Sequence, residues 1–249
     1  MILLKNEFEI DCIRKSSTIG AKVLLEIEKY IEVGITTYAL NAIIEDIIKK
    51  YNAVPAFKGY RGFPYGSCIS INEEVIHGIP GKKKIKENDI VSIDVGIFLN
   101  GYFGDVAKTF CVGEVNKEKR KLVEVAEQSL YKAIEQVKVN NKIGDISFFI
   151  QNYVEMNGFS VVRDFVGHGI GKSLHEEPQI PNFGIKGQGC ILLPGMVLAI
   201  ETMVNMGNFK VKTLNDKWTI VTCDNNPSAH FEHTVVLTTN GVQILSLVD

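Results

Sequence analysis

The sequence predicts an α+β fold built from two similar halves, each with two helices followed by strands. In the first half, apolar residues recur at three- and four-residue steps and β-branched segments follow, which predicts helices over about 7–32 and 37–51 and strands over 67–71, 89–99 and 102–112. The same order then recurs, with helices expected over about 117–137 and 146–157 and strands over 195–204, 217–223 and 230–238. We therefore expect one domain over residues 1–249, with an internal repeat of approximately 7–112 and 117–245.

The boundaries of the first two helices follow from local signals. The first helix is expected to run from about Glu7 to Glu32, and Gly34 stops it. The second is expected to begin near Thr37, with Thr36 or Thr37 as the N-cap, because a hydroxyl there accepts a hydrogen bond from a free amide of the first turn.

Composition restricts the class of protein. At 249 residues the chain can bury a sizeable core, and its net charge of −2 excludes a basic surface field suited to DNA. The five cysteines are widely spread without a C-x-x-C pair, which argues against a disulfide framework or a sulfur-rich zinc site. Apolar runs are too short for a secretory signal or a membrane span. We expect a soluble, cytoplasmic monomer.

Four acidic residues lie inside apolar strand sequence, two in each half: Asp94, Asp105, Glu201 and Glu232. A carboxylate between valine, isoleucine and phenylalanine is costly to bury unless a positive charge compensates it. Four of them on one sheet face would repel one another, so they must bind cations or take up protons.

A hairpin places the first two acids. Asn100-Gly101 is a strong signal for a two-residue turn, and that turn makes Asp94 oppose Ala107, with Asp105 two residues along on the same face. Diagonal neighbours of this kind have Cβ atoms roughly 7 to 8 Å apart, which lets both carboxylates reach metal ions. A bulge at one of the nearby glycines would change this register.

The segment 165–178, "FVGHGIGKSLHEEP", fails three familiar motifs. Val166 stands where a phosphate loop needs glycine, Lys172 where a dinucleotide fingerprint needs glycine, and Gln179 where a helical zinc motif needs histidine. His168, between two glycines, is instead a suitable nitrogen donor to the acidic cluster, and we expect a turn here that brings His168 and His175 to one cavity. One histidine with four carboxylates suits Mn, Fe or Co, with Zn also possible, and the chemistry of metal-assisted hydrolysis.

Over nearly its whole length the chain resembles the type I methionine aminopeptidases. The matching segments keep the family's order and spacing: "GFPYGSCISINEEVIHGIP", "IVSIDVGIFLNGYFGDVAKTF", "FVGHGIGKSLHEEPQIPNFG", "LLPGMVLAIETMVNMG" and "SAHFEHTVVLTTNG". The resemblance implies the pita-bread fold, in which helices cover a curved, mainly antiparallel sheet of two pseudo-symmetric halves. It also implies removal of the N-terminal methionine from nascent proteins whose second residue is small.

By resemblance, two divalent ions are expected with five ligands: Asp94, Asp105, His168, Glu201 and Glu232. Asp105 and Glu232 would bridge both ions, and Glu201 would also accept the proton of the attacking water. His175 would hydrogen-bond the scissile carbonyl as its oxyanion develops, and His77 would contact the peptide nitrogen beyond the cleaved bond. His230 lies two residues from Glu232 on the same face of its strand, and neither His230 nor His233 is expected to be a ligand.

The resemblance also implies a methionine pocket with apolar walls, formed by Phe57, Tyr60, Phe63, Cys68, Leu174 and Trp218. Cys68 is interpreted as a soft wall beside the thioether rather than a nucleophile. Several positions depart from the family's common residues: Phe57 replaces cysteine, Phe63 tyrosine, Leu174 phenylalanine, Gly96 threonine and Thr202 proline. These departures leave the pocket's shape, the metal preference and the rate open.

Two other functions remain open. Xaa-Pro aminopeptidases and dipeptidases share the fold but usually carry a large extra N-terminal domain, whereas here the catalytic core begins almost at residue 1. A non-catalytic binding module of the same fold should lack ligands, and all five candidates are present. Only 30 residues separate Glu201 from Glu232, too few for the insertion of the type II enzymes, and no N-terminal zinc-binding extension is expected. A basic loop, Lys82 to Lys86, is a candidate contact with ribosomal RNA.

Overall fold

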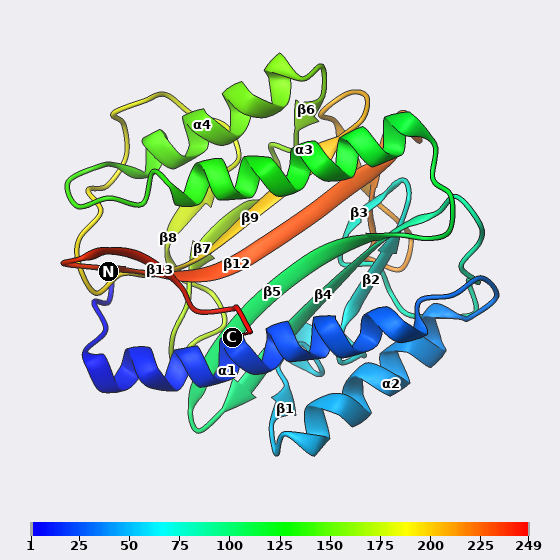
Figure 1. The fold of residues 1–249 in the computed structure, drawn as a ribbon, viewed down its shortest axis with the longest axis horizontal. Helices are drawn as coiled ribbons and strands as arrows, with labels where there is room; N and C mark the ends of the chain where they lie inside the picture. Colours follow the sequence, from blue (N-terminus) through cyan, green and yellow to red (C-terminus); the bar gives the residue numbers. More distant parts are fainter. Residues whose placement is uncertain (1, 249) are drawn as a thin grey trace.

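The computed structural model describes residues 2–248, and it has the predicted order of helices and strands (Figure 1). The helices are α1 (Glu7–Ile27), α2 (Thr37–Lys50), α3 (Lys117–Ile134) and α4 (Ile143–Met156), with short 3₁₀ turns at Glu28–Tyr30 and Tyr60–Gly62. The strands of the first half are β1 (Val54–Pro55), β2 (Cys68–Ile71), β3 (Glu74–Ile76), β4 (Ile90–Leu99) and β5 (Tyr102–Cys111). Those of the second half are β6 (Ser160–Val161), β7 (Val166–Gly169), β8 (Glu176–Pro181), β9 (Val197–Asn205), β10 (Val211–Thr213), β11 (Ile220–Thr222), β12 (Ser228–Thr238) and β13 (Gly241–Ile244).

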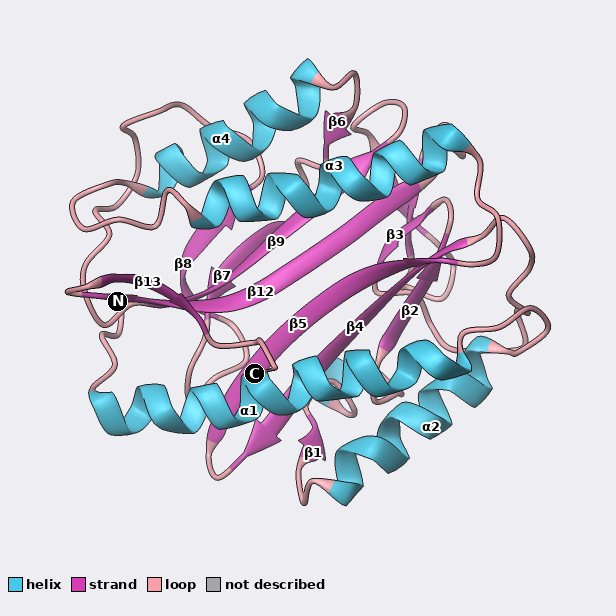
Figure 2. Ribbon diagram, viewed as in Figure 1, coloured by secondary structure: helices cyan, strands magenta, loops and turns pink. Residues whose placement is uncertain are grey.

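One large sheet joins the two halves. Its order is β1-β4-β5-β12-β9-β7-β8. In addition, β13 pairs with β12, β2 with β4 and β6 with β9, and all these pairings are antiparallel. The halves meet where β5 pairs with β12, and β10, β11 and β3 form a smaller sheet beside it. The central strands β4, β5, β12 and β9 are the long ones, so the middle of the sheet is its most continuous part (Figure 2).

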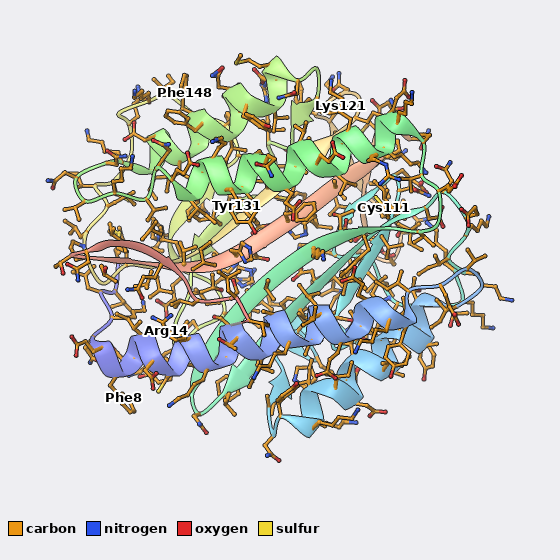
Figure 3. All side chains as sticks on the ribbon, in the orientation of Figure 1. Phe8, Arg14, Cys111, Lys121, Tyr131 and Phe148 are labelled. Atoms are coloured by element: carbon orange, nitrogen blue, oxygen red, sulfur yellow. The ribbon has the colours of Figure 1, made fainter. Side chains whose placement is uncertain are left out.

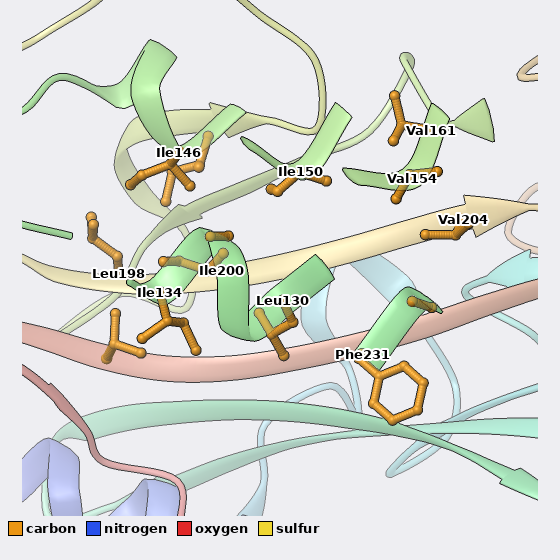
Figure 4. Close-up of a cluster of buried hydrophobic side chains, with 14 of the residues drawn as sticks. Leu130, Ile134, Ile146, Ile150, Val154, Val161, Leu198, Ile200, Val204 and Phe231 are labelled. Carbon is orange, nitrogen blue, oxygen red and sulfur yellow. The ribbon is translucent and has the colours of Figure 1, made fainter. Parts of the chain in front are cut away.

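The helices lie on one face of this sheet. α1 packs on β4 and β5, and α3 packs on β9 and β12, with α2 and α4 outside them (Figure 1). Apolar side chains fill both contacts; the core between α3, α4 and β9 includes Ile134, Ile146, Ile150, Leu198 and Ile200 (Figure 4). Since strand side chains alternate between faces, the residues between these apolar ones point to the helix-free face. Within residues 2–248, no helix combines the length and apolarity that a bilayer crossing requires.

Local signals account for the helix starts better than for the ends. Thr36 caps α2 by accepting the amide of Ala39 at 3.1 Å, one of the two caps predicted. The first α-helix ends at Ile27, earlier than predicted, and continues only as a 3₁₀ turn. The helix α4 begins at Ile143, earlier than predicted, where the carboxylate of Asp145 accepts the amide of the N-cap residue Lys142 at 2.7 Å.

The hairpin between β4 and β5 has the predicted register. Asn100 and Gly101 both have positive φ, 52° and 85°, as a two-residue hairpin turn requires. Asp94 pairs with Ala107, and Gly96 pairs with Asp105, with no bulge along the ladder. Asp94 and Asp105 are therefore diagonal neighbours on one face of the sheet.

Candidate metal centre

Five neighbouring strands each bring one candidate ligand to the helix-free face of the sheet. In sheet order these are Asp94 on β4, Asp105 on β5, Glu232 on β12, Glu201 on β9 and His168 on β7. Cross-strand pairing aligns them along one line. Glu232 lies opposite both Glu201 and Ala107, and His168 lies opposite Ala199, two residues from Glu201. The structure thus gathers all five side chains from segments far apart in the sequence.

Burial and like charge make this cluster unstable by itself. Burial raises the pKa of Asp94 and Glu232 well above the ordinary carboxyl value, and neighbouring carboxylates raise it further. Burial and the charge of Glu201 raise the pKa of Asp105 to about 8. Burial acts in the same direction on Glu201, but the nearby His230 imidazole outweighs it and lowers the pKa of that carboxyl. Three of the four acids therefore require a cation or a proton at neutral pH.

The donor atoms fit a divalent cation. Asp105, His168 and Glu232 each place one ligand atom so that all three lie within 4.8 Å of one another. Asp94 Oδ1 and Glu232 Oε1 are buried without a hydrogen-bond partner among the described residues, and such atoms are costly unless something binds them. Four carboxylates with one imidazole form an oxygen-rich set, which suits Mn, Fe, Co or Zn rather than a sulfur-bound structural zinc.

His168 lies on the strand β7, and the turn expected in this segment begins after it and brings His168 and His175 to one cavity. β7 adds to the edge of β9, and only the segment between β7 and β8, which contains His175, is a loop. The flanking glycines permit close packing: a Cβ on Gly167 would lie 2.6 Å from the Ala199 carbonyl oxygen, and one on Gly169 would lie 2.2 Å from that of Glu177. His168 Nδ1 lies 2.9 Å from the Gly169 carbonyl oxygen and so donates to it, which leaves the Nε2 lone pair free for a metal.

Sequence reasoning assigned no task to His230, yet it contacts the cluster. His230 Nε2 lies 3.4 Å from Glu201 Oε2, and both side chains are nearly buried. His233 points to the opposite face, where its Nδ1 lies 2.8 Å from the Ser246 hydroxyl. Strand alternation had placed His230 on the same face as Glu232, but the contact with Glu201 on the next strand is not visible in one sequence.

A cavity of about 120 Å³ opens beside the five side chains. Its lining includes all of them, together with most residues predicted for substrate contact: Phe57, Tyr60, Phe63, His77, Leu174, His175 and Trp218. Arg61, Ile76 and His230 also line it and were not predicted as site residues. Cys68 does not line it; this buried residue pairs with Asp94 across β2 and β4 and belongs to the apolar cluster around Phe57.

Two of the unusual residues are in direct contact. A Cβ on Gly96 would lie 2.5 Å from Cε1 of Phe57, closer than packed atoms approach, so the phenylalanine ring occupies the space that a larger residue at 96 would need. Gly96 is the partner of Asp105 across the ladder, so the ring packs directly beside the cluster. Thr202 instead faces away from the cavity, and its hydroxyl donates to the Ala126 carbonyl oxygen of α3 at 3.0 Å.

Gly96→Thr should destabilise the protein, by about 1–3 kcal/mol, because its side chain overlaps the Phe57 ring. Phe57→Cys should remove the overlap, so the double variant should be more stable than the sum of the two single effects implies. Chemical denaturation of the four proteins measures this coupling. Gly81→Thr is the matched control, since a Cβ there meets only one atom, at 3.9 Å. Additive effects at 57 and 96 would show that the two residues are not a packing pair.

Asp105→Asn should stabilise the metal-free protein at pH 8. The carboxyl holds its proton more tightly when folded, so its contribution to stability is greatest below the unfolded pKa near 3.8 and is lost as pH rises to about 8. We expect the melting temperature of the variant to exceed that of the metal-free wild type by roughly 5 °C at pH 8 and by less at pH 5.

Mn²⁺ should raise the melting temperature of the wild type more than that of Asp105→Asn. Asp224→Asn is the control for the metal-free comparison at pH 8, and it should lower the melting temperature. Asp224 accepts the amides of Asn208 and Asn226, and its pKa is lowered. An Asp105→Asn protein that melts below the metal-free wild type at pH 8 would contradict the uncompensated charge inferred here.

Comparisons with known proteins agree with this geometry. Residues 11–239 match the model of metallopeptidase family M24. A methionine aminopeptidase of Clostridium perfringens is 54% identical over 248 residues, covering 100% of both chains. The crystal structure of a methionine aminopeptidase from Thermotoga maritima superposes with a TM-score of 0.98 at 46% identity, again over 100% of both chains.

A more distant structure shares the fold alone. A prolidase from Pyrococcus furiosus has a TM-score of 0.79 at 23% identity and is covered over 66% of its length. The α+β architecture with its mainly antiparallel sheet is therefore the pita-bread fold. From the matched family model, the identity over the full chain and the superposed fold, it follows that this chain belongs to metallopeptidase family M24, among the methionine aminopeptidases.

Proposed function

We propose that this protein removes the N-terminal methionine from polypeptides with a small second residue, by metal-dependent hydrolysis. The main support is one cavity, in which five candidate ligand side chains lie beside a wall of apolar and aromatic residues. The first suits activation of water, and the second suits an unbranched thioether side chain. Methionine aminopeptidases with which this chain shares about half of its residues also support methionine as the residue removed.

Two divalent ions would be held by Asp94, Asp105, His168, Glu201 and Glu232. Asp105 and Glu232 lie on the two central strands, with Asp94 to one side and Glu201 and His168 to the other. Asp105 and Glu232, at the middle of this row, would help to hold both ions. Such ions supply Lewis acidity, which lowers the pKa of water and polarises a carbonyl oxygen. Mn, Fe, Co and Zn all suit this donor set.

The remaining polar side chains would handle the proton and the peptide bond. Glu201 is the cluster's one carboxyl with a lowered pKa, so it stays ionised and can accept the proton of the attacking water. His175 faces the cavity and would donate a hydrogen bond to the scissile carbonyl as its oxygen becomes negative. His77, packed edge-on against Phe165 and Trp218, would contact the nitrogen of the next peptide unit.

The methionine side chain would occupy the apolar part of the cavity. Phe57, Phe63, Leu174 and Trp218 line it, and the Phe63 ring packs edge-on against Trp218 with centroids 5.2 Å apart. Tyr60 closes the side next to His175. Cys68 would act through the packing of Phe57 and Phe63 rather than by contact with the substrate.

We also propose one catalytic domain in which residues 7–112 and 117–245 are related halves. Each half contributes two helices to the same sheet face and two carboxylates to the opposite face. The protein would act as a cytoplasmic monomer on nascent chains, and its five unpaired cysteines suit a reducing compartment. Xaa-Pro cleavage is the second candidate activity, because the same fold occurs in a prolidase; a non-catalytic binding role is the third.

Kinetics on Met-Ala-Ser and on an Xaa-Pro dipeptide, with Mn²⁺ present, test the proposal. The wild type should cleave the first and not the second. His168→Ala should lose bound Mn²⁺ and activity, because it removes a ligand. His175→Ala should retain Mn²⁺ while kcat falls about 100-fold or more. Preference for Xaa-Pro would favour the second candidate, and inactivity with Mn, Co, Fe and Zn the third. Loss of metal in His175→Ala would contradict the assigned division between the histidines.

A transient ribosome contact would use the exposed lysines among residues 82–86. Lys82, Lys83 and Lys84 are exposed, although Lys83 is 2.9 Å from Glu74 and partly neutralised. Replacing Lys82, Lys84 and Lys86 by glutamate should weaken co-sedimentation with ribosomes at low salt, because phosphate contacts depend on cationic side chains. Peptide hydrolysis by this variant should stay unchanged. Equal co-sedimentation of the two proteins would exclude this loop as the contact.

A further inference from the structure

The two histidines of the segment 165–178 lie against each other, and their ring nitrogens have different partners. The rings of His168 and His175 have centroids 4.2 Å apart. His168 Nδ1 lies 2.9 Å from a backbone carbonyl oxygen, which can only accept, so that nitrogen carries its proton. His175 Nδ1 lies 2.9 Å from the hydroxyl of Tyr60, which can donate. The proton positions of the two imidazoles therefore have separate causes.

The chemistry of the two groups favours the Tyr60 hydroxyl as the donor in its contact with His175. A phenol is a strong O–H donor and a weak acceptor, because its oxygen lone pair is delocalised into the ring, whereas an unprotonated imidazole nitrogen is a strong acceptor. The Arg61 guanidinium lies 5.3 Å from the Tyr60 ring centroid and draws electron density from the phenol, which strengthens the donor further. With Nδ1 accepting, the proton of neutral His175 resides on Nε2.

The backbone around Tyr60 is built to hold that hydroxyl in place. Gly59, Arg61 and Gly62 all have positive φ, and for Arg61, at 49°, that conformation is unfavourable unless its surroundings fix it. The amide of Tyr60 donates to the Phe57 carbonyl at 2.9 Å, and its carbonyl accepts the amide of Phe63 at the same distance. The Tyr60 ring stacks on His175 with an interplanar angle of 18°. Ring and hydroxyl are thus positioned together.

We propose that Tyr60 is a positioning residue whose hydroxyl holds His175 in the Nε2–H tautomer, so that this N–H donates to the scissile carbonyl oxygen. The proposal rests on the function proposed above, in which His175 stabilises the developing oxyanion. It assigns the two adjacent imidazoles opposite tautomers: Nε2 of His168 keeps its lone pair for a metal, and Nε2 of His175 keeps its proton for the substrate. Tyr60 thereby contributes more than an apolar wall.

Tyr60→Phe separates the hydroxyl from the ring. On Met-Ala-Ser with Mn²⁺ present, kcat should fall about 10-fold or more while KM changes less than about 3-fold, because ring packing is kept and only transition-state stabilisation is lost. In a His175→Ala background the same substitution should have no further effect on kcat. A change in KM alone, or additive losses in the double variant, would overturn the proposal and leave Tyr60 as a pocket wall.

Tyr131→Phe is the matched control. Its hydroxyl lies 3.4 Å from Nε2 of His233, so the chain contains a second tyrosine–histidine contact, and Tyr131 projects from α3 on the helix-covered face (Figure 3). Removing that hydroxyl should leave kcat unchanged. An equal loss of kcat in both variants would mean that the effect is general to the fold, which contradicts a role specific to His175.

Long-range ¹H–¹⁵N NMR spectra of the Zn²⁺-loaded protein read the tautomer directly. The wild-type His175 signals, assigned by their absence in His175→Ala, should show a protonated Nε2 and an unprotonated Nδ1. In Tyr60→Phe the two shifts should move toward each other. A protonated Nδ1 in the wild type would overturn the proposal. If instead His175→Ala keeps full activity, the proposed role of His175 itself fails, whatever the Tyr60 result, so the two failures are distinguishable.

Discussion

Four carboxylates held side by side on one face of the sheet repel one another, and the site is stable only where this repulsion is offset. Asp94, Asp105, Glu201 and Glu232 come from four adjacent strands, and burial disfavours their charged forms. Arg61 is the one arginine or lysine in the cavity lining within residues 2–248, and its guanidinium lies over Tyr60. Bound divalent cations would offset this repulsion, so a charged site as well as an apolar core shapes the fold.

The two faces of the central strands have different roles: one packs against the helices, and the other carries the candidate ligands. On β12, Glu232 points to the cavity, while Phe231 packs in the core and His233 faces α3. Because strand side chains alternate, a one-residue slip would exchange these positions and bury a carboxylate under a helix. The hairpin turn at Asn100-Gly101 and the long pairing of β9 with β12 prevent such a slip. Register is therefore as important to this site as the identity of its ligands.

Features encoded by local signals could be predicted from the sequence, and features that depend on distant contacts could not. The Asn100-Gly101 turn determines the register of Asp94 and Asp105 within a short segment, so that part of the geometry was predictable. The position of His168 as a strand residue depends on β7 docking against β9, some 30 positions further along, and glycine-rich sequence gave no sign of it. Only the alternation along β12 pointed to His230, and the family resemblance supplied the roles that spacing could not.

The unusual pocket residues illustrate the same limit. Phe57 and Gly96 each depart from the family's common residue, but they lie on separate segments, and only the structure shows that the Phe57 ring occupies the space a side chain at 96 would need. Likewise, Tyr60 and His175 are 115 residues apart, and their contact arises only when the 59–63 loop and the β7–β8 loop meet at the cavity. The positions of the cavity residues therefore depend on loops that the sheet brings together, and no local sequence pattern predicts such contacts.

Anomalous diffraction from crystals grown with Mn²⁺ shows whether this face of the sheet binds metal. We expect two neighbouring Mn²⁺ peaks among Asp94, Asp105, His168, Glu201 and Glu232, with Asp105 and Glu232 contacting both. Their absence from this face of the sheet at saturating Mn²⁺, or ordered Mn²⁺ bound only elsewhere on the protein, would contradict it.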